Sequence, residues 1–305
     1  MRIRVLGSSA GGGFPQWNCN CPNCDGVRRG TLRATPRTQS SIALSADGTD
    51  WLLVNASPDI LQQIRDNPEL QPARAIRDTG IAAVLLMDAQ IDHVTGLLML
   101  RERKTPLPLL ATPEVFSDIS CGFPITGILS HYCGVDRQTL PIDGSAVQIP
   151  ALPGLQLQTV ALSSKPPPYS PFRGAPRPGD NIGLLATNPT TGAKAFYAPG
   201  LAEVTPELIG LMSGCAVVLV DGTFWTHDEM QRLGLSTKAA LDMGHLPQSG
   251  PGGMVEQLAK LPAGVRKILI HINNTNPMLV EDSPERAELT ARGIEVAHDG
   301  MSIEV

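Results

Sequence analysis

Several residue classes are scarce in this sequence of 305 residues, and each shortage excludes something. Aromatic residues make up only 4% of the chain and charged residues only 17%. Lysine and arginine are dispersed, so the chain lacks the basic stripe that binds nucleic-acid phosphates or an anionic membrane surface. The net charge of −5 points the same way. We therefore expect neither nucleic acid nor a membrane among the partners.

Long apolar runs are also absent from the sequence. A membrane-spanning helix needs about 18 or more consecutive apolar residues, and no such stretch occurs. The first residues, Met1–Gly7, include two arginines and lack the apolar core of a secretion signal. The sequence thus predicts a cytoplasmic protein without membrane insertion, in a compartment where thiols stay reduced.

Glycine and proline are plentiful, with 30 and 27 residues, and they predict many turns and long loops. The segment 163–179 holds six prolines in 17 residues. We call this segment the Pro-rich loop. Irregular loops of that length inside a compact domain are usually functional or mobile.

Apolar runs with β-branched residues recur along the chain and predict strands. They cover residues 41–44, 52–54, 81–87, 155–162, 181–187, 216–220, 267–272 and 294–296. An N-cap side chain followed by proline predicts helix starts at Ser57-Pro58, Thr112-Pro113 and Ser283-Pro284. Strands that alternate with short helices predict a layered α/β (α+β) fold.

Three of the six cysteines crowd into one segment. Cys19, Cys21 and Cys24 lie within six residues and are separated by Asn and Pro rather than by apolar residues. Buried free thiols are the alternative reading, but this spacing in a reducing compartment is typical of metal ligands. Three thiolates can surround one tetrahedral Zn²⁺ together with a fourth ligand from elsewhere. The sequence therefore predicts a structural zinc site.

Three predicted core strands end in side chains that can bind a metal. Asp92 and His93 follow the first such strand, Asp221 follows the second and His271 the third. A lone Asp or His in such a place is ordinarily a hydrogen-bonded core residue. Because the carboxyl ends of strands that share a sheet converge, the three together predict a second metal centre.

These residues also carry a family resemblance. Asp88-x-Gln90-x-Asp92-His93 resembles the metallo-β-lactamase signature His-x-His-x-Asp-His with its first two histidines replaced. Longer segments, 8–17, 92–97 and 271–277, are similar to the family of coenzyme PQQ synthesis protein B (PqqB), over essentially the full chain. The resemblance implies an αββα four-layer sandwich in one domain over residues 1–305, with a zinc-binding cysteine loop at about 18–25 and the Pro-rich loop at 163–179.

The resemblance further implies how the active site is built. The ordinary first metal site is expected to be empty, because Asp88 and Gln90 replace two of its histidines. The second site keeps its ligands, and we expect them to bind one metal: Asp92, His93 and His271, with the bridging Asp221. Two imidazoles and a carboxylate with open positions are typical of non-haem Fe(II). His245 matches a proton donor of phosphodiesterase members, so the implied catalytic residues are His245 and Asp221.

The sequence pattern leaves open the fourth zinc ligand and the roles of the other histidines. The phosphodiesterase branch uses a histidine three positions after the last active-site histidine, and here that position is Asn274. His298 and Asp299 are the other candidates for the fourth zinc ligand. His131 and His227 follow no core strand, and we expect them to be structural or surface residues.

The implied function is pyrroloquinoline quinone (PQQ) biosynthesis, by an iron-dependent oxygenase that hydroxylates the tyrosine ring of a Glu-Tyr-derived precursor. Lys165, Arg173 and Arg177 of the Pro-rich loop are candidate contacts for such an anionic substrate. Two alternatives stay open: a carrier of PQQ or its precursor toward export to the periplasm, and a single-metal hydrolase. Other PQQ-pathway proteins are candidate partners, and the oligomeric state is undetermined.

Overall fold

The computed structural model describes residues 1–305, and the chain divides into two compact units. Unit 1 consists of Met1–Gly7, Ser40–Ala193 and Gly300–Val305, and unit 2 consists of Ser8–Gln39 and Lys194–Asp299. Neither unit is one continuous segment of the sequence. The expectation of one domain over residues 1–305 stays a prediction.

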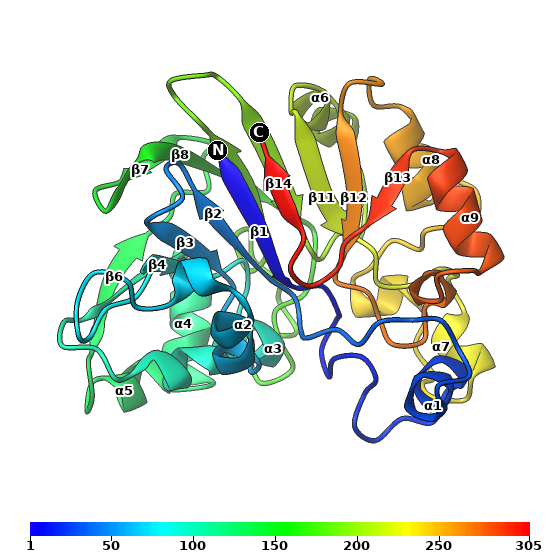
Figure 1. Cartoon of the computed structure of the whole chain (residues 1–305), viewed down its shortest axis with the longest axis horizontal. Helices are drawn as coiled ribbons and strands as arrows, with labels where there is room; N and C mark the ends of the chain where they lie inside the picture. The colour runs from blue at the N-terminus through cyan, green and yellow to red at the C-terminus, as the bar shows by residue number, and fades with distance from the viewer. The chain divides into compact units, whose positions relative to one another are not determined.

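Unit 1 contains a sheet with the strand order β14-β1-β2-β3-β4-β5-β6. Its strands are β1 (Arg2–Gly7), β2 (Ser41–Ser45), β3 (Trp51–Val54), β4 (Ile81–Leu85), β5 (Leu107–Ala111), β6 (Val135–Thr139) and β14 (Ser302–Glu304). From β3 to β6 the neighbours are parallel, whereas β1 is antiparallel to both β14 and β2. The two termini therefore meet (Figure 1), and the Met1 amino group donates to the Val305 carbonyl at 2.7 Å.

Helices cover this sheet in unit 1, where Figure 1 shows them gathered together. They are α2 (Ile60–Asp66), α3 (Ile91–Val94), α4 (Pro113–Cys121) and α5 (Ile125–Leu129), with short 3₁₀ helices at Pro68–Leu70 and Thr95–Leu100. Their apolar residues share one buried cluster with strand residues such as Leu53, Val84 and Leu109. Three further strands, β7 (Ala146–Ile149), β8 (Leu152–Ala161) and β9 (Ile182–Thr187), form antiparallel pairs in sequence order.

Unit 2 contains four parallel strands in the order β13-β12-β11-β10. They are β10 (Lys194–Ala198), β11 (Val217–Asp221), β12 (Arg266–Ile270) and β13 (Ile294–Val296). Its helices are α1 (Pro22–Arg29), α6 (Pro206–Ser213), α7 (Glu229–Arg232), α8 (Met254–Ala259) and α9 (Pro284–Ala291), with 3₁₀ helices at Leu241–Met243 and Pro277–Leu279. Because Asp221 pairs with Ile270 across parallel strands, the carboxyl ends of β11 and β12 lie at the same edge.

Most predicted elements are confirmed, and the errors have local causes. Thr112 and Ser283 cap α4 and α9, as predicted. The predicted helix start at Ser57-Pro58 is wrong by two residues: the Ser57 hydroxyl accepts from Asp59 N at 3.2 Å, and α2 begins only at Ile60. The strand predicted for 267–272 ends at Ile270, because His271 has a φ of 61°. The Pro-rich loop contains no helix and no strand. None of the helices is both long and apolar enough to cross a bilayer.

Candidate metal centres

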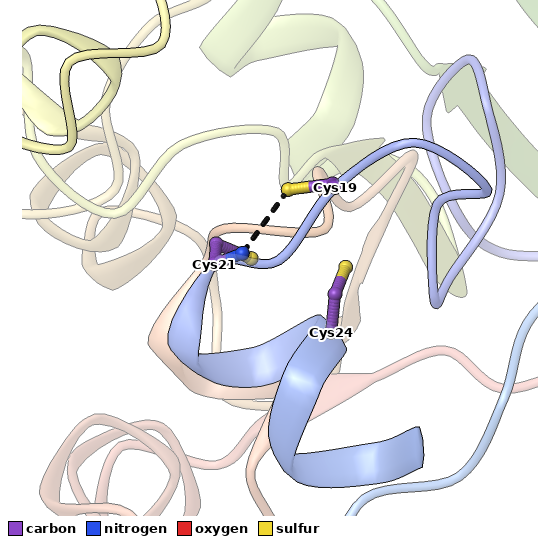
Figure 2. Close-up of side chains that lie close together, drawn as sticks. All are labelled: Cys19, Cys21 and Cys24. Carbon is purple, nitrogen blue, oxygen red and sulfur yellow. Dashed lines mark hydrogen bonds between the residues drawn. The ribbon is translucent and has the colours of Figure 1, made fainter.

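The three clustered cysteines surround one point at the start of α1 in unit 2. Figure 2 shows their side chains directed toward one another, with Cys21 N donating to Cys19 Sγ at 3.4 Å. Proline directly after Cys21 starts the helix, so the chain turns between the second and third thiol. All three residues are buried, and the sulfur atoms lie within 4.8 Å of one another. This arrangement fits the predicted zinc, which needs thiolates at a common centre.

The thiols of the cluster differ in acidity. Burial raises the pKa of the Cys21 thiol to about 12. Burial acts in the same direction on Cys19, but hydrogen bonds from Cys21, Cys24 and Asn274 outweigh it and lower the pKa of that thiol. A metal that binds here must displace protons from the thiols, so its affinity will depend on pH.

Asn274 lies against all three sulfur atoms. Its Nδ2 is 3.2 Å from Cys19 Sγ, 3.5 Å from Cys21 Sγ and 3.3 Å from Cys24 Sγ. Its backbone carbonyl oxygen lies 3.7 Å from Cys21 Sγ. A half-turn of the amide would present the side-chain oxygen in place of Nδ2. The position that the family pattern indicated thus reaches the cluster and offers two oxygen atoms as a fourth ligand.

The two other candidates for the fourth zinc ligand do not join the cysteines. His298 is exposed. One carboxylate oxygen of Asp299 accepts from Ser8 N and Oγ at 2.9 and 2.8 Å, and the other accepts from Thr38 N and Oγ1 at 2.6 and 2.8 Å. Both carboxylate oxygens are therefore already engaged in holding loop segments.

A second cluster in unit 2 lies at the carboxyl edge of its strands. Asp221 ends β11, His271 follows β12, and His245 follows the 3₁₀ helix Leu241–Met243. One potential ligand atom from each lies within 4.8 Å of the others. The two imidazole rings are stacked, with centroids 5.4 Å apart and an interplanar angle of 21°. The predicted convergence of strand ends is therefore correct for these residues.

Asp221 is fully buried and heavily hydrogen-bonded. Its Oδ1 accepts from Thr223 N at 2.8 Å, and its Oδ2 accepts from Leu201 N at 2.8 Å. The same Oδ2 lies 2.6 Å from His245 Nδ1. Because a carboxylate can only accept, it orients the His245 ring with a proton on Nδ1. Asp221 thus has the geometry of a residue that holds and polarises a histidine.

In unit 1 the signature segment follows β4 and enters α3. Asp88 Oδ1 accepts from Gln90 N at 2.8 Å and lies 2.7 Å from His93 Nδ1. On the other side of the ring, Asp92 Oδ2 is 3.7 Å from His93 Nε2. Burial opposes a charge on His93, but the carboxylates of Asp88 and Asp92 outweigh it and raise the pKa of the imidazole to about 9. Asp88 therefore orients His93, so Nε2 is the nitrogen that would bind a metal.

The remaining predicted residues are two histidines, and two arginines of the Pro-rich loop. His131 and His227 are exposed, as expected of surface residues. Arg177, however, pairs with Asp180 at 2.9 Å and stacks on the ring of Phe172, and Arg173 donates to a carbonyl of its own loop. These two guanidinium groups stabilise the Pro-rich loop, which argues against the predicted substrate contact.

Sequence reasoning missed two buried polar residues beside these centres. Thr223 contacts both His245 and His271, and Glu229 accepts from Trp225 N at 2.7 Å and from the Thr275 hydroxyl. The sequence held a signal for Thr223, because this residue lies two positions after Asp221, an aspartate at a strand end that could bind a metal. Glu229 had none, since its partner Thr275 is distant in the sequence.

Comparison with known proteins agrees with the geometry. The model of the β-lactamase superfamily domain matches residues 50–272. Among curated proteins, coenzyme PQQ synthesis protein B of Cupriavidus necator is 67% identical over 301 residues, covering 99% of this chain and 98% of that protein. The protein of the same name from Azoarcus sp. is 61% identical over 301 residues, covering 99% of both chains.

Solved structures support the same assignment. Zn²⁺-bound PqqB from Methylobacterium extorquens has a TM-score of 0.89 and 39% identity, with full coverage of both chains. A diphosphatase of the PhnP family, at 17% identity and a TM-score of 0.67, covers 100% of this chain and 98% of its own and shares the fold. The predicted metallo-β-lactamase fold is thereby confirmed. The chain belongs to the coenzyme PQQ synthesis protein B family of the β-lactamase superfamily.

Proposed function

We propose that this chain acts in PQQ biosynthesis as an iron-dependent oxygenase that hydroxylates the tyrosine ring of a Glu-Tyr-derived precursor. The relatives named as PQQ synthesis proteins support the pathway. The observation that carries the chemistry is the donor set at the strand ends, which consists of imidazoles and carboxylates. A site of this composition suits Fe(II) with open coordination positions.

The residues that would hold the active-site metal are Asp92, His93, Asp221 and His271. The match to the superfamily signature supports this assignment, and both histidines are buried with Nδ1 hydrogen-bonded to a protein group. Such bonds fix a histidine ligand in orientation and tautomer. The chemistry that iron supplies when bound is the activation of dioxygen. The three cysteines and Asn274 would hold a separate structural zinc.

His245 and Asp221 are the proposed catalytic pair. With Nδ1 of His245 held against the buried Asp221 carboxylate, the ring can exchange a proton through Nε2. The carboxylate stabilises the imidazolium that forms when the ring takes up that proton. Replacement of His245 by Gln should therefore lower turnover while the bound metal is retained.

Metal analysis of the Fe(II)-loaded protein, prepared without oxygen, tests the proposal. We expect one zinc and one iron per chain, with only the iron lost in His93→Ala and in His271→Ala. The exposed His227 offers a matched control, and His227→Ala should keep both metals. Zinc alone, unchanged by either substitution, would refute the oxygenase and favour the carrier of PQQ or its precursor.

A single-metal hydrolase is the second candidate, and the diphosphatase of the PhnP family that shares the fold is the reason to keep it. In this case zinc would occupy the same ligands and polarise a water molecule, with His245 as the acid. Two zinc equivalents per chain, together with hydrolysis that persists without oxygen, would support this candidate. Dependence of product formation on both iron and oxygen would support the oxygenase.

We further propose a cytoplasmic location, a small-molecule or dipeptide-like precursor as ligand and other PQQ-pathway proteins as partners. All six cysteines are free thiols, which suits a reducing compartment. Fractionation of the producing cells checks the location. Co-purification of a tagged chain with pathway proteins, compared with an unrelated tagged protein, checks the partners.

A further inference from the structure

Thr223 lies at the centre of the histidine cluster in unit 2. It follows β11 by two residues, and only 2% of its surface is exposed. Its Oγ1 lies 2.9 Å from the His271 carbonyl oxygen, 3.0 Å from His271 Nδ1 and 3.1 Å from His245 Nδ1. One hydroxyl group therefore contacts the backbone of one histidine and the rings of two.

The backbone around Thr223 holds the hydroxyl in this place. Thr223 N donates to Asp221 Oδ1 at 2.8 Å, and its carbonyl accepts from Asn273 N at 3.1 Å. The preceding residue is Gly222, where a Cβ would lie 2.9 Å from Met278 Cε and 3.0 Å from the Ile270 carbonyl oxygen, so a larger residue would crowd this turn. Because this turn lies close to Met278 and Ile270, the Thr223 hydroxyl is placed beside the histidines.

The single proton of the hydroxyl determines the protons on the rings. The His271 carbonyl can only accept, so the Thr223 proton points to that oxygen. The oxygen lone pairs of Thr223 then face His271 Nδ1, which must carry a proton to make its contact. For His245 the Nδ1 proton is donated to the carboxylate of Asp221 at 2.6 Å, and Thr223 Oγ1 at 3.1 Å is the more distant neighbour of that proton. For His271, the contact with Thr223 favours this proton position.

We propose that Thr223 is a positioning residue that selects the Nδ1–H tautomer of His271 and directs its Nε2 lone pair outward as the metal ligand. The same hydroxyl holds the His271 backbone, whose φ of 61° lies in a region that side chains other than glycine rarely adopt. Tautomer and backbone conformation are thus set together. The role of Nε2 as a ligand rests on the proposed function, whereas the tautomer does not.

Two substitutions separate the hydroxyl from the shape of the side chain. Thr223→Val keeps the volume and removes the hydroxyl, and Thr223→Ser keeps the hydroxyl and removes a methyl group. Long-range ¹H–¹⁵N spectra of the metal-free, ¹⁵N-histidine-labelled protein report which ring nitrogen carries the proton. We expect Nδ1–H for His271 in the wild type and in Thr223→Ser, and a population of Nε2–H in Thr223→Val.

Competition of Fe(II) against a chelator gives the second measurement. We expect Thr223→Val to weaken binding at the histidine site by about 10- to 100-fold, the effect typical of losing a hydrogen bond behind a ligand, and Thr223→Ser to restore it. The zinc of the cysteine cluster should stay at one equivalent in both variants, as an internal control for folding.

The outcomes distinguish the inference from the proposed function. Nε2–H on His271 in the wild-type protein overturns the inference without any variant. Where His271→Ala loses the iron, equal Fe(II) affinity of wild type and Thr223→Val also overturns it. If the wild type shows Nδ1–H but His271→Ala still binds iron at full affinity, the tautomer assignment stands and the proposed metal site fails.

Discussion

The cysteine cluster and the histidine cluster of unit 2 are built in opposite ways. The thiols come from one short segment and contact mainly one another and Asn274, so a metal that displaces their protons would be the main bond between them. Asp221, His245 and His271 come from three separate parts of the chain, and each already has a protein partner. A metal would therefore hold the first centre together, whereas hydrogen bonds preorganise the second.

One loop joins the two clusters. His271 stands at its start, and Asn274 contacts the sulfurs three residues later. Asn23 of α1 donates to the carbonyls of Asn274 and Asn276 at 3.1 and 3.0 Å, and Asn276 Nδ2 donates to the Gly222 carbonyl at 2.9 Å. Disturbance of the cysteine cluster should therefore reach the histidines, although the reverse effect should be small.

The largest effect is expected from Cys24→Ser, which breaks the metal-held centre. Cys24 is fully buried, and a hydroxyl is a poor substitute for a thiolate ligand. We expect loss of one zinc equivalent and a decrease in the free energy of unfolding of several kcal/mol, because metal binding contributes directly to folding. Elemental analysis and urea denaturation measure both. Cys121→Ser, at an exposed free cysteine, is the control and should change neither.

The pH dependence of the free energy of unfolding tests the His93 imidazole, which the carboxylates of Asp88 and Asp92 hold. Its pKa is raised from 6.5 to about 9, so the charged ring stabilises the metal-free folded state fully below pH 6.5, and this contribution is lost as the pH rises through 9. Since each pKa unit corresponds to about 1.4 kcal/mol, the loss should be on the order of 3 kcal/mol. Denaturant unfolding from pH 6 to 10 measures it. His93→Gln should flatten this dependence, whereas a slope that persists in this variant would contradict the assignment.

Substitution of Glu229 tests the hydrogen bonds that hold Thr275 of the joining loop. It is 3% exposed and accepts from Trp225 N at 2.7 Å and from Thr275 Oγ1. Glu229→Gln can keep its oxygen on Trp225 N and turn its N–H to the Thr275 hydroxyl, which can also accept, so both bonds persist without the carboxylate charge and we expect about 1 kcal/mol of destabilisation. Urea denaturation measures this change, and Glu256→Gln on α8 is a suitable control. Unchanged stability would show that the loop is held from the cysteine side alone.

The two centres also differ in what the sequence could reveal. The cysteine site is local, so its spacing predicted it directly, but the helix α1 (Pro22–Arg29) was not predicted although proline follows Cys21. The convergence of Asp221 and His271 followed from the parallel strands. The position of Asp88 against His93 required the path of the chain after β4, which no spacing encodes.

Some elements that were not predicted had a signal in the sequence, and others had none. Thr205 caps α6 with proline after it, the same signal that correctly marked α4, and it was overlooked. The edge strand β6 carries the sequence Val-Asp-Arg-Gln-Thr and is largely exposed, so no apolar pattern marks it. Its existence depends on pairing with β5, which is tertiary information.

The smallest effect is expected at Asn274, where the joining loop meets the sulfurs. Asn274→Ala removes the amide from its positions 3.2 to 3.5 Å from the three Sγ atoms but leaves the backbone carbonyl 3.7 Å from Cys21 Sγ. If the carbonyl is the fourth zinc ligand, zinc should remain at one equivalent with affinity reduced about 10-fold, as for the loss of a supporting hydrogen bond. Loss of the zinc would instead make the side-chain oxygen the ligand. Asn273→Ala, one residue earlier, controls for changes in the loop, and chelator competition reads out both variants.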